Sequence, residues 1–212
     1  NMSNNSYVTA TGEEMGRAQV EQAYAAGVEP DVRMNPVLLK PEADQRSQVV
    51  VLGRPAFHLS GQDFHTRKAE LWPVVTRALD ELRAQYDLVV IEGAGSPAEI
   101  NLREADIANM RVARYAQAPV LLVGDIDRGG VFALYGTLAL LPAEERALVR
   151  GLVINKFRGS HELLAPGLEM IAALTGVPVL GVVPYLPELC IADEDAATLD
   201  EVRPSPSGAL LD

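Results

Sequence analysis

The chain's most informative chemistry-bearing segment is an acid followed by a flexible turn. An apolar run, Leu88–Ile91, ends at Glu92, and Gly93-Ala94-Gly95 follows at once. This pattern is typical of a buried parallel strand that delivers a carboxylate to the C-terminal edge of an α/β sheet, where ligands bind. Because glycines let a phosphate approach the backbone, Glu92 is predicted to hold a phosphate-bound magnesium ion. The alternative is a strand-end acid that only caps the turn.

A second apolar run ends in a denser group of charged residues, just before a helical pattern. Two acids, an arginine and two glycines follow one another there: Asp125, Asp127, Arg128, Gly129 and Gly130. The glycines leave the helix N-terminus uncovered, which favours anion binding, and an arginine can grip a carboxylate or phosphate with two hydrogen bonds. We interpret the segment as part of a functional site. A solvated turn with a local Asp–Arg pair is the alternative.

A third run, Gly151–Ile154, is followed by Asn155 and Lys156. An asparagine amide offers a donor and an acceptor that match a purine edge, so Asn155 is a candidate reader of a nucleotide base. Asparagine is also common in turns, and the dipeptide by itself is a weak signal. Its position one strand after the acidic run favours the nucleotide interpretation.

One part of a nucleotide site is absent from the sequence. No Gly-x-x-x-x-Gly-Lys-[Ser/Thr] motif occurs. Such a phosphate loop is expected on a first strand upstream of Asn1. Either the chain is not a nucleotide enzyme, or that strand, its loop and its helix are missing.

Composition restricts the partners. The net charge of −11 disfavours a nucleic-acid face, and no run approaches 18 apolar residues, so no membrane span is predicted. The single cysteine, Cys190, rules out an intrachain disulfide, fits a cytoplasmic setting and is interpreted as structural. The three histidines, at positions 58, 65 and 161, lack metal-ligand spacing.

Apolar runs and helical periodicity alternate along the chain. Strands are predicted at Gln48–Leu52, Leu88–Ile91, Pro119–Val123, Gly151–Ile154 and Pro178–Val183. Helices are predicted at Glu13–Ala26, Phe64–Gln85, Arg103–Ala116, Val131–Leu141 and Glu162–Leu174, the last capped by Gly176. The alternation predicts an α/β fold, a mostly parallel sheet with helices on both faces.

Three segments do not follow this alternation of strands and helices. Asn1–Gly12 is polar and turn-rich, and the proline-containing Val28–Gln45 is expected to form a long loop beside the site. Residues 192–212 are acidic and then rich in proline and serine, which is typical of a linker. We therefore expect one α/β domain over residues 1–191, truncated at its N-terminus, and a linker over 192–212.

Several segments together strongly resemble the N-terminal synthetase domain of the cobyric acid synthases. They are Asn1–Ser6, Gly12–Gln19, Met34–Pro41, Glu92–Leu102, Gly124–Ala133 and Ile154–Gly159. The broader relatives are dethiobiotin synthetases and MinD-type ATPases, so the resemblance implies a P-loop NTPase-like fold whose first strand and phosphate loop are missing here.

The resemblance implies an activity, with its cofactors and partners. The family converts adenosylcobyrinic acid a,c-diamide to adenosylcobyric acid by amidating the b, d, e and g carboxylates. It uses ATP, Mg²⁺ and ammonia that a glutaminase domain of the same chain releases from glutamine. That domain is expected after the linker, so residues 1–212 alone are not expected to hydrolyse glutamine. Because the phosphate loop is missing as well, they are not expected to bind ATP properly. A homo-oligomer is compatible with this.

The resemblance also assigns roles. Glu92, with Glu14 as a second ligand, is expected to hold magnesium, and Asn155 and Lys156 to contact the nucleotide with Gly93 and Gly95. Asp125, Asp127 and Arg128 are expected where the corrinoid carboxylate meets the γ-phosphate. The expected substrate-binding residues are Asn1, Ser3, Asn4, Ser6, Gly129 and Gly130. A capping cluster before Glu13 is the alternative for the first four.

Two other readings share the scaffold. A MinD- or ParA-like ATPase switch is expected to carry a membrane-binding helix or a basic face, and neither is evident in this acidic chain. The second alternative is another ligase on the same scaffold, such as the synthetase that makes the a,c-diamide. The Asn1–Ser6 and Asp125–Gly130 segments favour cobyric acid synthase.

Overall fold

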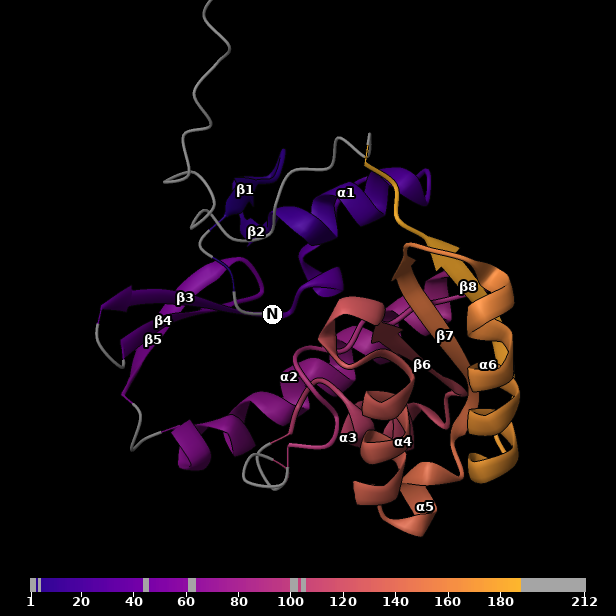
Figure 1. Cartoon of the computed structure of the whole chain (residues 1–212). Helices are drawn as coiled ribbons and strands as arrows, with labels where there is room; N and C mark the ends of the chain where they lie inside the picture. The colour runs from indigo at the N-terminus through magenta and orange to yellow at the C-terminus, as the bar shows by residue number, and fades with distance from the viewer. Residues whose placement is uncertain are drawn as a thin grey trace, which may run out of the picture. The chain divides into compact units, whose positions relative to one another are not determined.

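The computed structural model describes residues 3, 5–43, 46–60, 64–99, 103 and 106–187 (Figure 1). The chain divides into two compact units. The first contains the described residues up to Phe64, and the second contains those from His65 onward.

The first unit is built mainly from antiparallel strands. β1 pairs with β2, and β3, β4 and β5 form a separate three-stranded sheet in that order. Its elements are β1 (Ser6–Val8), β2 (Glu14–Gly16), α1 (Arg17–Ala25), the short 3₁₀ helix η1 (Val32–Met34), β3 (Val37–Ala43), β4 (Arg46–Val51) and β5 (Arg54–Ser60).

The β4–β5 hairpin corrects two predictions. The strand predicted at Gln48–Leu52 exists, but it pairs antiparallel on both sides instead of joining a parallel sheet. The chain reverses within two residues, Leu52 and Gly53, at φ of 45° and 76°, and a parallel crossover needs about a dozen residues or more. Val28–Gln45, predicted as a loop, contains η1 and β3.

The first helix is shorter than predicted. A helix was expected over Glu13–Ala26, whereas α1 spans Arg17–Ala25. Glu14, Met15 and Gly16 are paired with β1, and the Met15 side chain is fully buried. Burial of Met15 in strand geometry therefore decides the local structure over helical propensity.

The second unit contains the parallel sheet. Its elements are α2 (Phe64–Gln85), α3 (Met110–Ala116), β6 (Val120–Asp125), the 3₁₀ helix η3 (Ile126–Arg128), α4 (Gly130–Leu140), α5 (Ala143–Arg146), β7 (Val149–Phe157), α6 (His161–Thr175) and β8 (Val179–Pro184). The strand order is β6-β7-β8, and both pairs are parallel. Figure 1 shows α6 running beside β7 and β8. The α/β class and the three last predicted strands are confirmed.

One hydrophobic core joins this sheet to α4 and α6. The core side chains include Leu122, Leu134, Leu138, Leu152, Ile154 and Ile171. Consecutive β7 residues must point to opposite faces, so the near-continuous apolar run of β7 is what a central parallel strand requires. The helix predicted at Glu162–Leu174 is confirmed, and Gly176 closes it at φ 68° with its N–H bonded to the Ala172 carbonyl.

The strand predicted at Leu88–Ile91 is not present in the structure. These residues have no regular secondary structure, and the side chains of Leu88 and Val90 are 78% and 87% exposed. An apolar strand needs a paired neighbour to satisfy its backbone, and no described strand pairs with this segment.

The helix predicted at Arg103–Ala116 begins only at Met110. The Asp106 carboxylate accepts hydrogen bonds from the backbone N–H groups of Ala108, Asn109 and Arg111, between 2.8 and 3.1 Å. An acidic side chain that satisfies the N–H groups at a helix start marks the helix boundary, so Asp106 explains the late start of α3.

The predictions for Cys190, for the linker at 192–212 and for Asn1 and Asn4 fall outside the described residues. Among the described residues, no helix is both long and apolar enough to cross a membrane.

Candidate functional site

The ends of β6 and β7 bring together five polar residues at the C-terminal edge of the parallel sheet. We call them the β6–β7 edge cluster: Asp125, Asp127, Asn155, Lys156 and Arg158. Asp125 and Asn155 are register partners in the parallel ladder. Parallel strands end at the same edge, so two segments separated by about 30 residues meet there because of the sheet topology.

Asp125 is the most constrained acid of the cluster. Its carboxylate lies 3.0 Å from Lys156 Nζ and also accepts the Asp127 N–H at 2.9 Å. The hydrogen bond from Lys156, followed by that from the Asp127 backbone, lowers the pKa of Asp125 below its ordinary value. Asp125 is therefore ionised throughout the neutral range.

Asp127 pairs with a residue that the sequence analysis did not assign. Arg158 Nη2 lies 2.5 Å from Asp127 Oδ2, and its guanidinium stacks over the Tyr185 ring at 4.2 Å. Tyr185 follows β8 and donates its backbone N–H to the Phe157 carbonyl. Arg158 occurs only three residues after Asn155, which is the signal that could have identified it. No local sequence signal identifies Tyr185, because only the fold brings it against Arg158.

Gly129 and Gly130 form the turn into α4. Both have positive φ, 90° and 47°, and no side chain caps this helix start. Positive φ disfavours residues with a Cβ, so the turn explains the glycine pair. The start of α4 therefore lacks a side-chain cap, and it follows Asp127 and Arg128 directly in the chain.

Asn155 and Lys156 adopt an unusual backbone arrangement. Lys156 has φ 57°, in the left-handed region, and its N–H bonds to Asn155 Oδ1 at 2.9 Å. This contact fixes the orientation of the Asn155 amide at the end of β7. Strained backbone of this kind is concentrated at functional sites, which supports the interpretation of Asn155 as a recognition residue.

Glu92 lies in the second unit, in an exposed segment without regular structure. Gly93 and Ala94 of the following turn contact Asn109, and Gly95 has φ 65°. No group of three or more His, Cys, Asp or Glu side chains is gathered among the described residues. Mg²⁺ needs no such group, because one or two carboxylates suffice when phosphate oxygens and water supply the other ligands. The Glu92 carboxylate is an oxygen ligand of the kind that this mode of binding requires.

Glu14 belongs to the first unit and lies on β2. Its carboxylate is 2.5 Å from Lys40 Nζ. Partial burial opposes its ionisation, but hydrogen bonds from Lys40 and Ser6 and the charge of Lys40 outweigh it, so the pKa of Glu14 is lowered. Ser6 begins β1, and the Ser3 side chain is buried with its hydroxyl bonded to Asn5 backbone atoms. Asn1 and Asn4 lie outside the described residues.

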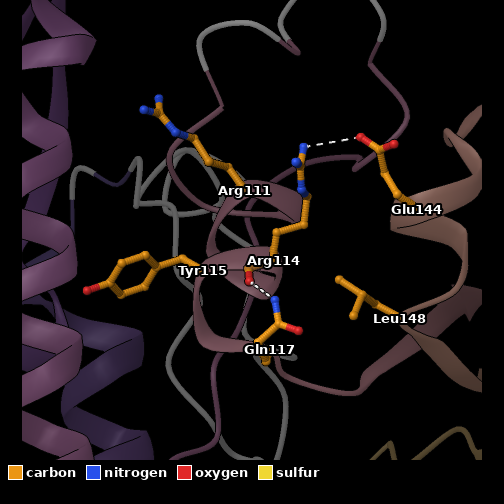
Figure 2. Close-up of a pocket in the computed structure, with 6 residues that line it drawn as sticks. All are labelled: Arg111, Arg114, Tyr115, Gln117, Glu144 and Leu148. Carbon is orange, nitrogen blue, oxygen red and sulfur yellow. Dashed lines mark hydrogen bonds and ion pairs between the residues drawn. The ribbon is translucent and has the colours of Figure 1, made fainter.

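A hollow of the second unit lies elsewhere, beside α3, with a volume of about 520 Å³. Figure 2 shows six residues that line it: Arg111, Arg114, Tyr115, Gln117, Glu144 and Leu148. Arg114 pairs with Glu144 at 3.5 Å, and Arg111 stacks over the Trp72 ring at 4.1 Å. The charged groups are thus used to connect α2, α3 and α5, so we interpret this hollow as structural.

Comparison with known proteins tests the family that the sequence suggested. The family model described as "AAA domain" matches residues 4–191. The chain belongs to this family. It is also similar to proteins named cobyric acid synthase, at 61% identity over 210 residues in Sorangium cellulosum, 57% over 203 in Carboxydothermus hydrogenoformans and 56% over 212 in Chloroflexus aurantiacus.

These alignments cover 98%, 95% and 100% of the chain, but 40%, 41% and 43% of the respective relatives. The chain therefore spans about two fifths of the length of the curated relatives it matches. No solved structure matches the chain. The resemblance to cobyric acid synthases is confirmed, and so is the P-loop NTPase-like α/β fold class that it implied.

Proposed function

We propose that this AAA domain takes part in the ATP-dependent amidation of side-chain carboxylates on a corrinoid, adenosylcobyrinic acid a,c-diamide, for cobalamin biosynthesis. The observation that carries the proposal is the β6–β7 edge cluster. It gathers two acids and two cations at the edge of a parallel sheet, next to an uncovered helix start. Relatives that align over almost the whole chain are named for such a synthesis.

The chemistry explains why such a site is needed. A carboxylate resists attack by ammonia because it is anionic and has no good leaving group. In the proposed reaction, a substrate carboxylate oxygen attacks the γ-phosphorus of ATP and ADP leaves. Ammonia then attacks the carbonyl carbon of the acyl phosphate, phosphate departs and the nitrogen loses a proton. Most of the catalysis is positioning and neutralisation of charge.

The β6–β7 edge cluster, together with the neighbouring Arg128, can both position the reacting groups and neutralise their charge. Lys156 and Arg158 of the cluster, and Arg128 beside it in the chain, are cations that can neutralise the carboxylate and γ-phosphoryl groups where they meet. Asp125 and Asp127 hold Lys156 and Arg158 in place through their ion pairs. Gly129 and Gly130 present the start of α4 to an anion, while Asn155 orients the nucleotide base.

Magnesium and ammonia complete the proposal. Glu92, with Glu14 as a second ligand, would hold Mg²⁺, which would neutralise charge on the ATP phosphates when bound. The ammonia is proposed to come from glutamine through a glutaminase domain. The polar segment that includes Asn1, Ser3, Asn4 and Ser6 is proposed to bind the corrinoid rim.

The decisive experiment uses the intact protein that carries residues 1–212, with the a,c-diamide labelled with ¹⁸O in its free carboxylates. Incubation with ATP, Mg²⁺ and either glutamine or ammonium should yield amidated corrinoids by mass spectrometry. One ¹⁸O per amidation should appear in inorganic phosphate. Amidated product with unlabelled phosphate would exclude the acyl phosphate, and absence of any product would overturn the proposal.

The same reaction separates the other candidates. A MinD- or ParA-like switch hydrolyses ATP without changing the corrinoid, and its turnover responds to a partner instead. A synthetase that makes the a,c-diamide would amidate cobyrinic acid in preference to the diamide. Parallel incubations with both corrinoids therefore distinguish the three functions.

A further inference from the structure

The turn that follows Glu92 is fixed by a side chain from outside its own segment. Asn109 Nδ2 donates to the Ala94 carbonyl at 2.7 Å, and the Ala94 N–H donates to Asn109 Oδ1 at 2.9 Å. One carboxamide thus satisfies both backbone groups of one residue, as a neighbouring strand would. The two contacts also determine the orientation of the amide, because only the nitrogen can face the carbonyl.

Gly93 lies so close to Asn109 that a side chain there would collide with it. A Cβ placed on Gly93 would be only 2.3 Å from Asn109 Oδ1. The sequence suggested that Gly93 allows a phosphate to approach the backbone, but the structure shows the Asn109 carboxamide in that space. Gly95 has open space around its would-be Cβ and a φ of 65°, so its requirement is conformational.

Asn109 is itself held firmly. Its backbone N–H donates to Asp106 Oδ1 at 2.8 Å, and its carbonyl accepts the Ala113 N–H in the first turn of α3. The next residue, Met110, is buried in the core formed with α4 and the sheet. The Asn109 amide is therefore anchored through α3 to the hydrophobic core of the second unit, whereas the segment 88–94 has no strand of its own.

We propose that Asn109 is a positioning residue, which clamps the Gly93–Ala94 turn and thereby presents the Glu92 carboxylate for magnesium-bound ATP. The inference rests on the proposed function for the role of Glu92, but the clamp itself is a property of the chain alone. Partners that orient a metal ligand change metal affinity about 10–100-fold when they are removed.

The experiment compares the intact protein with three variants. Asn109→Leu keeps the branched shape of the side chain and removes both hydrogen bonds. Asn109→Asp keeps the acceptor for the Ala94 N–H but places a charged oxygen against the Ala94 carbonyl. Gly93→Ala displaces the amide from the opposite side. Gln85→Ala, which removes an exposed amide at the end of α2, is the matched control.

Two readouts are needed. Amide hydrogen exchange without ligands should show faster exchange at Ala94 in Asn109→Leu and Gly93→Ala than in the control, with thermal unfolding otherwise unchanged. Asn109→Asp, which keeps the acceptor, should protect the Ala94 N–H better than Asn109→Leu does. The Mg²⁺ concentration for half-maximal ATP turnover should rise about 10-fold or more in the variants. Combining Asn109→Leu with Glu92→Gln should add little to the effect of Glu92→Gln alone, because both act on one ligand.

Each result decides something. Unchanged exchange at Ala94 in both Asn109→Leu and Gly93→Ala would overturn the clamp. Faster exchange with an unchanged Mg²⁺ dependence would overturn the positioning role and leave Asn109 as a structural residue. A wild-type protein without Mg²⁺-dependent ATP turnover would refute the proposed function, and the exchange data would still decide whether the clamp exists. If Asn109→Leu fails to fold, Gly93→Ala carries the test.

Discussion

Lys156 forms an ion pair with Asp125 across the C-terminal edge of the sheet, with 3.0 Å between Lys156 Nζ and Asp125 Oδ2. The lysine is on the end of β7, at a positive φ of 57°, and the acid is on the end of β6. The pair therefore links two neighbouring strands at the point where the proposed reaction takes place, and it places a cation beside an acid that stays ionised at neutral pH.

Replacing Lys156 should change the titration of Asp125. Lys156→Met removes the largest cause of the lowered pKa, so the pKa of Asp125 should rise, as followed by ¹³C NMR of the side-chain carboxyl. A lowered pKa means that the pair adds stability above the ordinary pKa of an aspartate and loses it as the pH falls through the lowered value. Arg150→Met, an exposed change on the same strand, should leave the pKa of Asp125 unaltered.

Asp127→Asn should stall amidation while the protein stays folded. The acid holds Arg158 beside the expected position of the γ-phosphate, and its loss should leave partly amidated corrinoids or none, measured by mass spectrometry. Both side chains are more than half exposed, so the free energy of unfolding should change by less than about 1 kcal/mol. Asp80→Asn on α2 is the control. Normal product formation by Asp127→Asn would remove this residue from the mechanism.

Glu92→Gln should reduce Mg²⁺-dependent ATP turnover by at least about 100-fold, because the amide keeps the volume of the side chain but is a poor ligand for a hard cation. Turnover is measured by release of ADP over a range of Mg²⁺ concentrations. Glu169→Gln, on the exposed surface of α6, should behave like the wild type. Turnover at the wild-type level in Glu92→Gln would exclude Glu92 as a magnesium ligand.

Leu152→Ala should be among the most destabilising single changes in the second unit. Leu152 is 0% exposed on the central strand β7, and removal of such a side chain costs about 2–5 kcal/mol. Leu180→Ala makes the same change on the adjacent strand β8 at a side chain that is 57% exposed, and should cost much less. Urea unfolding compares the two. Equal losses would mean that the accessible face around Leu180 is covered in solution.

Local sequence patterns predicted the strands and helices whose structure depends mainly on their own residues. The strands β6, β7 and β8 and the helices α2, α4 and α6 were expected within a few residues of their observed bounds, because continuous apolar runs and helical periodicity each demand one geometry. The cap at Gly176 could be predicted for the same reason, since only a residue that tolerates positive φ ends the helix in that way.

Two strand predictions that depended on the pairing of distant backbone segments were wrong. The apolar composition of Leu88–Ile91 indicates that these residues can be buried. A strand forms only where another backbone pairs with it, however, and no described strand pairs with this segment. Gln48–Leu52 has the composition of a parallel strand, yet the two-residue turn at Leu52 and Gly53 commits it to an antiparallel hairpin.

By itself, the sequence determined the family and the kinds of chemical group available, because the motifs around Glu92, Asp125 and Asn155 are contiguous. Only the tertiary structure decided which of these groups meet. It paired Asp125 with Lys156 and Asp127 with Arg158 through the parallel register, and it brought Asn109 against Gly93 and Ala94. Contacts between residues 15 to 31 positions apart arise when strands and helices pack, and no local pattern in the chain encodes them.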